Sequence, residues 1–296
     1  RGCFMSVPHI SSLCRIAALA LAALACSAAS AQAVLQQIAM KGQINLGYRV
    51  DASPFSFRDG QGRPAGYMID LCQSAVERVQ AATGKVLRVN PVEVPADQVV
   101  RYLQAGTVDL LCAATTDTPE RRGAMAFSHP VFVSHARVLV RAVDGITAVD
   151  QLRDQSVVVI GRTTADTLAT QRAAERGWKV VRALDAVAAM GQLELGWARG
   201  YLRDDVLLLT QLAQGRNPEA YTLLPQELSN EPIAIAVRPG DPQLLKAVND
   251  ALVQANRSGL LEAAYQRWFM GPVPPFNRPV NLPMSATLKD ELARWR

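Results

Sequence analysis

From Gln43 onward, segments typical of β-strands alternate with segments typical of helices, and this order constrains the fold more than any other feature. Short runs of aliphatic and β-branched residues are followed by stretches with apolar residues three and four positions apart. Such alternation is typical of proteins with helices packed on mostly parallel sheets. The sequence therefore predicts an α/β fold, and its 296 residues are enough for about two domains.

The expected elements follow one another through most of the chain. We expect strands at residues 44–50, 86–94, 108–115, 137–143, 156–161, 179–184, 198–204 and 233–240. We expect helices at residues 68–84, 98–106, 164–176, 186–195 and 242–259. Residues 271–283 are rich in proline, which predicts an extended strap over the surface.

The first 33 residues have the pattern of a secretory signal peptide. Arg15 precedes the apolar run Ile16–Ala25, which is shorter than the roughly 20 residues of a membrane-spanning helix. Ala31-Gln32-Ala33 supplies a small-residue cleavage motif. We therefore expect residues 1–33 to be removed and the mature chain to be periplasmic, with lipid attachment at Cys26 as the alternative.

Two cysteines remain in the mature chain if residues 1–33 are removed as predicted. Cys3, Cys14 and Cys26 lie in the leader, which leaves Cys72 and Cys112. An even number of cysteines in an oxidising compartment favours a disulfide, and the alternative is a pair of buried thiols.

Composition and motifs exclude several classes of function. The net charge of +5 falls to +3 without Arg1 and Arg15, and the chain has no long run of Lys or Arg, so we expect no nucleic-acid partner. His129 and His135 are the histidines outside the leader and predict no metal site. Common catalytic and nucleotide-binding motifs are absent, so we expect no cofactor and no enzymatic activity.

A polar string follows the strand expected at residues 108–115. It reads TTDTPERR, and Pro119 suits the first turn of a helix that Asp117 or Thr118 can cap. This string is either a well-formed helix start or a binding loop. In a binding loop, Thr116 donates a hydroxyl and Arg121 offers a two-pronged donor for a carboxylate.

Two further strings place polar groups where an expected strand ends. Thr163 and Thr164 follow the strand at residues 156–161 and begin a helix, whose free N–H groups and dipole favour an anion. The strand at residues 198–204 leaves a carboxylate at its end, at Asp204 or Asp205. An anion site and a partner for an ammonium group together predict an α-amino acid as the ligand.

These strings and their neighbours resemble one known family over nearly the whole chain after the leader. They read LGYRVDASPFSFRDGQGRPAGYMIDLC, LQAGTVDLLCAATTDTPERRGAMAFSHPVF, VVVIGRTTADTL, YLRDDVLL, EPIAIAVRPGDPQLLKAVNDAL and SGLLEAAYQRWF. The chain resembles the bacterial extracellular solute-binding proteins of family 3, and within them the glutamate/aspartate-type periplasmic proteins of ABC importers.

The resemblance implies a two-lobe periplasmic-binding-protein fold of type II, joined by two crossover strands that act as a hinge. It places lobe 1 at residues 34–136 and 231–296 and lobe 2 at residues 137–230. It also implies the ligand contacts. Arg121, Thr116, Thr163 and Thr164 hold the α-carboxylate, Asp204 pairs with the α-ammonium beside its neighbour Asp205, and Arg49 faces the ligand side chain.

The sequence departs from the glutamate/aspartate type at several of these positions. Val99 stands where that type has a second arginine, Ala114 where it has a serine, and Ala186 where it has a histidine. Arg162 replaces the glycine of its Gly-Thr-Thr motif. The resemblance therefore implies that the contacts to the ligand's α-carboxylate and α-ammonium groups are preserved, whereas fewer residues contact the ligand side chain.

The resemblance implies a monomeric receptor that delivers an amino acid to the membrane permease of an ABC importer. Two alternatives stay open. Some proteins of this fold are periplasmic dehydratases, which need a general acid in the cleft. Others present their ligand to a sensor protein.

Overall fold

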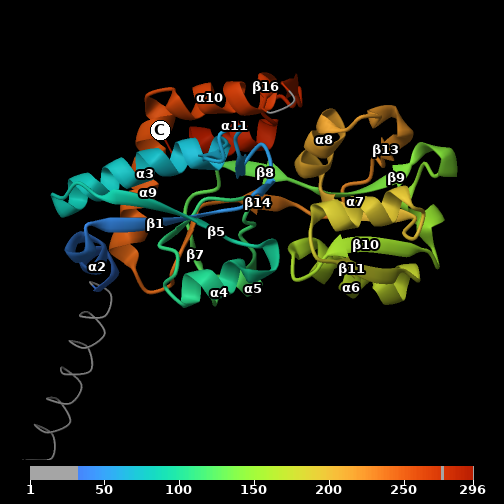
Figure 1. Ribbon diagram of the computed structural model, residues 1–296, viewed down its shortest axis with the longest axis horizontal. Coiled ribbons are helices and arrows are strands. Elements are labelled where there is room, and N and C mark those ends of the chain that lie inside the picture. The colour runs from blue at the N-terminus through green and yellow to red at the C-terminus, as the bar shows by residue number, and fades with distance from the viewer. Residues whose placement is uncertain (1–32, 275–276, 296) are drawn as a thin grey trace, which may run out of the picture.

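The computed structural model describes residues 33–274 and 277–295, and it has two α/β lobes side by side, joined by a pair of short strands (Figure 1). The predicted two-lobe α/β fold is thereby confirmed. The predicted signal peptide and Cys26 lie outside the described residues. Within them, no helix is both long enough and apolar enough to cross a membrane.

The first lobe is built on a five-stranded sheet with the order β5–β1–β6–β15–β7. Its strands are β1 (Gln43–Tyr48), β5 (Arg88–Glu93), β6 (Leu110–Leu111), β7 (Ala126–Phe127) and β15 (Ala236–Val237). β1 pairs in parallel with β5 and β6, whereas β15 runs antiparallel to β6 and β7. A three-stranded sheet follows β1 and contains β2 (Asp51–Ala52), β3 (Ser56–Arg58) and β4 (Pro64–Ala65).

Helices cover this sheet and include the C-terminal part of the chain. They are α2 (Ala33–Lys41), α3 (Tyr67–Thr83), η1 (Ala96–Gln98), α4 (Val99–Gln104), α5 (Pro119–Arg122), α9 (Pro242–Arg257), α10 (Leu260–Tyr265), the π-helix η5 (Gln266–Met270) and α11 (Ala286–Ala293). The tail also forms the hairpin of β16 (Pro272–Val273) and β17 (Arg278–Pro279). The strap predicted for the tail is thus partly regular structure.

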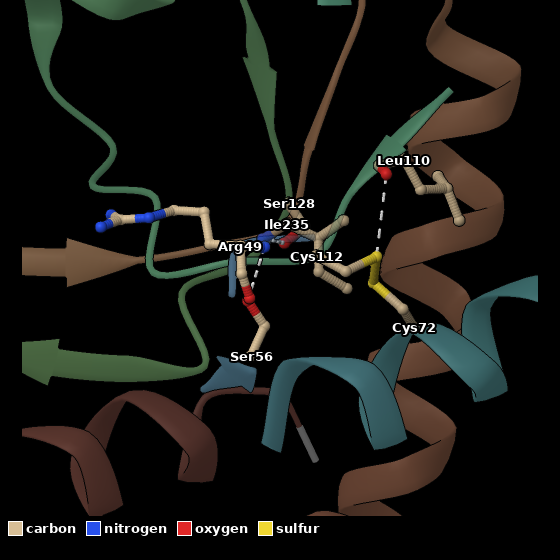
Figure 2. Close-up of a disulfide and its surroundings, with 7 residues drawn as sticks. All are labelled: Arg49, Ser56, Cys72, Leu110, Cys112, Ser128 and Ile235. Atoms are coloured by element: carbon tan, nitrogen blue, oxygen red, sulfur yellow. Dashed lines mark hydrogen bonds between the residues drawn. A yellow bond between two sulfur atoms is a disulfide. The ribbon is translucent and has the colours of Figure 1, made fainter. Parts of the chain in front are cut away.

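A disulfide joins Cys72 of α3 to Cys112, which directly follows β6. Both cysteines are fully buried, and the backbone N–H of Cys112 donates to the carbonyl of Gly47 at 2.7 Å. The predicted disulfide is confirmed. Figure 2 shows that it lies beside Arg49, whose side chain extends away from the sulfur atoms. The bond therefore fastens α3 to the strand that leads into the loop containing Arg121.

The second lobe has a sheet with the order β11–β10–β12–β9–β13. Its strands are β9 (Ala136–Arg141), β10 (Ser156–Ile160), β11 (Lys179–Ala183), β12 (Gly200–Asp204) and β13 (Tyr221–Leu223). Its helices are η2 (Ala142–Asp144), η3 (Val149–Leu152), α6 (Thr164–Arg176), α7 (Ala186–Glu194), α8 (Asp205–Gln214) and η4 (Pro218–Ala220). β10 is parallel to β11 and β12, so their carboxyl ends meet at one edge.

The chain passes between the lobes through β8 (Phe132–Ser134) and returns through β14 (Glu231–Ile233). These strands pair with each other in antiparallel register, with Ser134 opposite Glu231. A single bridge also links Thr116 to Ile233. The loop after β6 is therefore held against the returning crossover strand, beside the second lobe.

Candidate functional site

A cavity between the lobes is lined by the ends of strands and the starts of helices from both. Its lining residues from the first lobe are Arg49, Ala96, Val99, Ala114, Thr115, Thr116 and Arg121. From the second lobe they are Ile160, Thr163, Thr164, Ala165, Leu202, Arg203, Asp204 and Leu207. With Ala114 counted among the positions predicted to face the ligand, the structure brings together seven of eight, and Asp205 is the one outside this lining.

Arg121 reaches the cavity from α5, a single helical turn. The turn begins as predicted, because Thr118 caps it by accepting a hydrogen bond from the Arg121 N–H at 3.3 Å, and Pro119 follows. The guanidinium Nη1 donates to the Thr116 carbonyl at 3.2 Å. Burial lowers the pKa of Arg121, although Glu231 and Asp204 act in the opposite direction. Among the ion pairs of the described residues, none includes Arg121, so its charge is available to a ligand carboxylate.

Thr163 and Thr164 lie at the N-terminus of α6, whose bounds match the prediction. The Thr163 hydroxyl caps the helix by accepting from the Asp166 N–H at 3.3 Å, and it donates to the Ile160 carbonyl at 2.7 Å. Thr164 and Ala165 line the cavity in the first turn, where N–H groups lack an acceptor within the helix. This end of α6 therefore adds anion-binding potential opposite Arg121.

Arg162 occupies the position where the resembling family has a glycine, and its φ of 60° explains that preference. A left-handed backbone conformation costs a residue with a side chain roughly 1–2 kcal/mol. The Arg162 N–H donates to the Asp166 carboxylate at 2.9 Å, which helps to hold the turn. The glycine of the motif is thus replaced without loss of the turn that places Thr163.

Asp204 ends β12 inside the cavity and is 9% exposed. Burial raises the pKa of its carboxyl to about 6, and repulsion from Glu231 adds to the rise, whereas Arg203 and Arg49 lower it. Glu231 belongs to the returning strand β14, is 4% exposed and accepts a hydrogen bond from Ser229 at 2.7 Å. The two carboxylates form a buried negative region that an ammonium group would neutralise.

We expect the affinity for a neutral α-amino acid to fall below about pH 6. Asp204 attracts the ammonium group when it is ionised and not when it is protonated, and the pKa of this carboxyl is raised to about 6. Protonation therefore competes with binding, and the dissociation constant should rise about tenfold per pH unit below that value. Calorimetric titration with L-glutamine between pH 4.5 and 8 measures this. A constant affinity over that range would contradict a role for Asp204 as the ammonium partner.

Asp205 lies at the junction of the lobes, one residue beyond the cavity. Its carboxylate accepts from the Ser134 hydroxyl at 2.6 Å and from the Val206 N–H at 2.7 Å. It also lies 3.6 Å from the imidazole of His135. The structure therefore places Asp205 in contact with the outgoing crossover strand β8 and outside the cavity that Asp204 lines, because the chain turns from β12 into α8 at this residue.

Arg49, Val99 and Ala114 line the cavity from the first lobe. Arg49 is 6% exposed, and its Nε and Nη2 donate to the Asp51 carboxylate at 2.8 and 2.9 Å. Burial opposes the charge of Arg49, but Asp51 outweighs it and raises the pKa of the guanidinium. Val99 and Ala114 line the same cavity and contribute no polar side-chain group.

A larger cavity of about 710 Å³ adjoins the first, and the two share Ala96 and Arg203. Ala186 lies in its lining together with Asp51 and Gln211. The space left inside the first cavity is only about 30 Å³. This is room for water but not for an amino acid. Ligand entry therefore requires the lobes or the lining side chains to move.

Sequence reasoning missed three charged residues that the structure places at the site. Asp51, Arg203 and Glu231 are all largely buried, and Arg203 is 5% exposed. Arg203 carried the clearest signal, because a charge inside the apolar strand YLRD has to find a partner. Among residues 33–274 and 277–295, no group of three or more His, Cys, Asp or Glu side chains is placed to hold a metal ion.

Comparison with known proteins agrees with this geometry. The family model for bacterial extracellular solute-binding proteins, family 3, matches residues 44–271. The glutamate/aspartate import solute-binding protein of Escherichia coli strain K12 is 32% identical over 284 residues, covering 92% of this chain and 94% of that protein.

Two solved structures extend the comparison. The solute receptor for L-cysteine of Neisseria gonorrhoeae superposes with a TM-score of 0.72 at 28% identity, covering 80% of this chain and 94% of the receptor. The ancestral amino-acid-binding protein AncCDT-1, a precursor of cyclohexadienyl dehydratase, has a TM-score of 0.69 at 26% identity, covering 80% and 99%. The chain belongs to the bacterial extracellular solute-binding proteins of family 3.

Proposed function

We propose that this protein binds an α-amino acid between its lobes and delivers it to the permease of an ABC importer. The observation that carries the proposal is that one cavity is lined both by Arg121, which forms no ion pair with a carboxylate of the described residues, and by the buried Asp204. Arg121 and the N-terminus of α6 suit an α-carboxylate, and Asp204 suits an α-ammonium. The import function of the Escherichia coli relative supports the transport role.

The location and state of the protein follow from the same proposal. A receptor that serves an importer works outside the cytoplasm, which agrees with the leader predicted at residues 1–33. We propose a periplasmic monomer whose lobe 1 contains residues 34–136 and 231–296 and whose lobe 2 contains residues 137–230. The paired strands β8 and β14 are then the hinge, because both connections between the lobes pass through them.

A thermal-shift screen of the mature protein against the standard amino acids and small dicarboxylates tests the binding function. A ligand present at 100 times its dissociation constant adds about 2.7 kcal/mol of stability, so the melting temperature should rise measurably. Asp204→Asn should abolish the shift, since a neutral amide does not attract the ammonium group. A screen without any shift would contradict amino-acid binding.

A dehydratase is the second candidate, and two observations favour testing it. The similarity to AncCDT-1 connects the fold with that activity. Asp204, with its pKa near 6, is also suited to donate a proton near neutral pH. Recovery of the bound ligand unchanged after prolonged incubation supports a binding protein, whereas a dehydrated product would establish the enzyme.

A further inference from the structure

Two arginines from opposite lobes meet one aspartate at the border of the two cavities. Arg49 follows β1 in the first lobe and binds the Asp51 carboxylate through two nitrogens, at 2.8 and 2.9 Å. Arg203 lies in β12 of the second lobe, and its Nη2 donates to the Asp51 carbonyl at 2.9 Å. The same nitrogen lies 3.8 Å from the Asp51 carboxylate. Asp51 thus contacts both guanidinium groups, and its contact with Arg203 links the two lobes.

The charges of the first cavity exceed what an amino-acid backbone requires. Its lining contains three arginines and one acidic residue, Asp204. The α-carboxylate and α-ammonium of a ligand use Arg121 and Asp204, which leaves Arg49 and Arg203. Asp51, which lies outside this lining, neutralises the charge of Arg49. Glu231 lies outside this lining, near Asp204, and offsets part of the remaining charge. Among the described residues, however, the Arg203 guanidinium has no carboxylate within hydrogen-bond distance, and the Asp51 carboxylate lies 3.8 Å from it.

Arg203 lies where it could replace the second arginine of the glutamate/aspartate type, which this chain lacks. Val99 stands where the glutamate/aspartate type has its second arginine, and both Val99 and Arg203 line the first cavity. Arg203 approaches from the opposite lobe, next in sequence to the ammonium partner Asp204. The Arg203 guanidinium thus supplies a second positive charge to the cavity from the second lobe, in place of the arginine that Val99 replaces.

We propose that Arg203 is a specificity-determining residue, which binds the side-chain carboxylate of a dicarboxylic amino acid together with Arg49. In this proposal the Asp51 carboxylate is an internal competitor, which binds Arg49 and lies near Arg203 until the ligand carboxylate displaces it. The inference rests on the proposed binding of an α-amino acid. Because Arg203 and Arg49 belong to different lobes, a carboxylate bound to both would also hold the cleft closed.

Isosteric pairs of amino acids separate this role from a structural one. L-Glutamate and L-glutamine, like L-aspartate and L-asparagine, have nearly the same shape and differ in the side-chain charge. A merely structural Arg203 would affect both members of a pair equally. A specificity residue changes the ratio of the two dissociation constants, which calorimetry of the mature protein at pH 7.5 measures.

We expect Arg203→Met to weaken binding of the preferred acidic amino acid about 10²-fold and its amide by less than about threefold. Asp51→Asn should act in the opposite direction, strengthening acidic binding about tenfold, because the internal competitor loses its charge. A misfolded variant cannot produce such a gain. Arg137→Met is the matched control, since Arg137 lies opposite Arg203 in the neighbouring strand β9 and outside the cavity lining.

The possible outcomes distinguish this inference from the proposed function. Equal weakening of acid and amide by Arg203→Met, or weaker acid binding by Asp51→Asn, would overturn the inference. If the wild-type protein binds neutral or basic amino acids but neither glutamate nor aspartate, the inference fails and the proposed function stands. If it binds no amino acid, the proposed function fails as well.

Discussion

Replacing Arg121 by alanine is expected to weaken the binding of every α-amino acid by about 10²-fold or more. The guanidinium is largely buried in the cavity, and within the described part of the chain it forms no ion pair with a carboxylate. Its loss removes the main charge opposite the α-carboxylate, which all amino acids share. Calorimetric titration of the variant with the best ligand from the thermal-shift screen measures the effect.

The neighbouring arginine provides the control for this variant. Arg122 belongs to the same helical turn, but its side chain is 65% exposed and is paired with the Asp117 carboxylate at 2.7 Å. Arg122→Ala removes one positive charge from the same place in the sequence and should leave the affinity within about twofold, because an exposed ion pair contributes little. Wild-type affinity in Arg121→Ala would contradict the site.

Removing the disulfide should have the largest effect on stability. Replacing both Cys72 and Cys112 by alanine frees a loop of 39 intervening residues in the unfolded chain. The loop-entropy model assigns such a cross-link roughly 3–4 kcal/mol. For a protein of this size the melting temperature should fall by about 10 °C. Calorimetric melting of the mature wild type and the double variant measures the difference.

The reduced wild-type protein gives an independent measurement of the same bond. Both sulfur atoms are buried, so reduction needs transient unfolding in the presence of a strong reductant. The melting temperature of the reduced wild type should be close to that of the double variant, and the reductant should not change the melting temperature of the variant. A double variant that melts within about 2 °C of the oxidised wild type would contradict a stabilising role.

Local signals in the sequence predicted the helices that have clear ends. The bounds of α6 agree with the prediction, because Thr163 caps its start and Gly177 ends it with a φ of 69°. Likewise α3 ends at Thr83, where the sequence predicted, because Gly84 caps it with a φ of 64°. These are interactions between residues a few positions apart, so a single segment of sequence contains both partners.

Elements without such local signals were missed or misjudged. The helix α8 begins at Asp205 directly after β12 ends at Asp204, with no turn residue between them. The strand expected at residues 108–115 is reduced to Leu110–Leu111, because the chain after Cys112 leaves the sheet for the cavity. The small sheet β2–β4 lacks the apolar alternation that marks a strand.

The sequence by itself determined the fold class, the disulfide and the polar strings that contain Thr116, Arg121 and Asp204. Each of these depends on residue type, periodicity or family resemblance, which the linear order of residues preserves. Only the tertiary structure placed Arg203 beside Asp51, which is 152 positions away, and Glu231 beside Asp204. These partners come from different lobes or from the returning strand, and their charges interact only after folding brings them together in a site that excludes water.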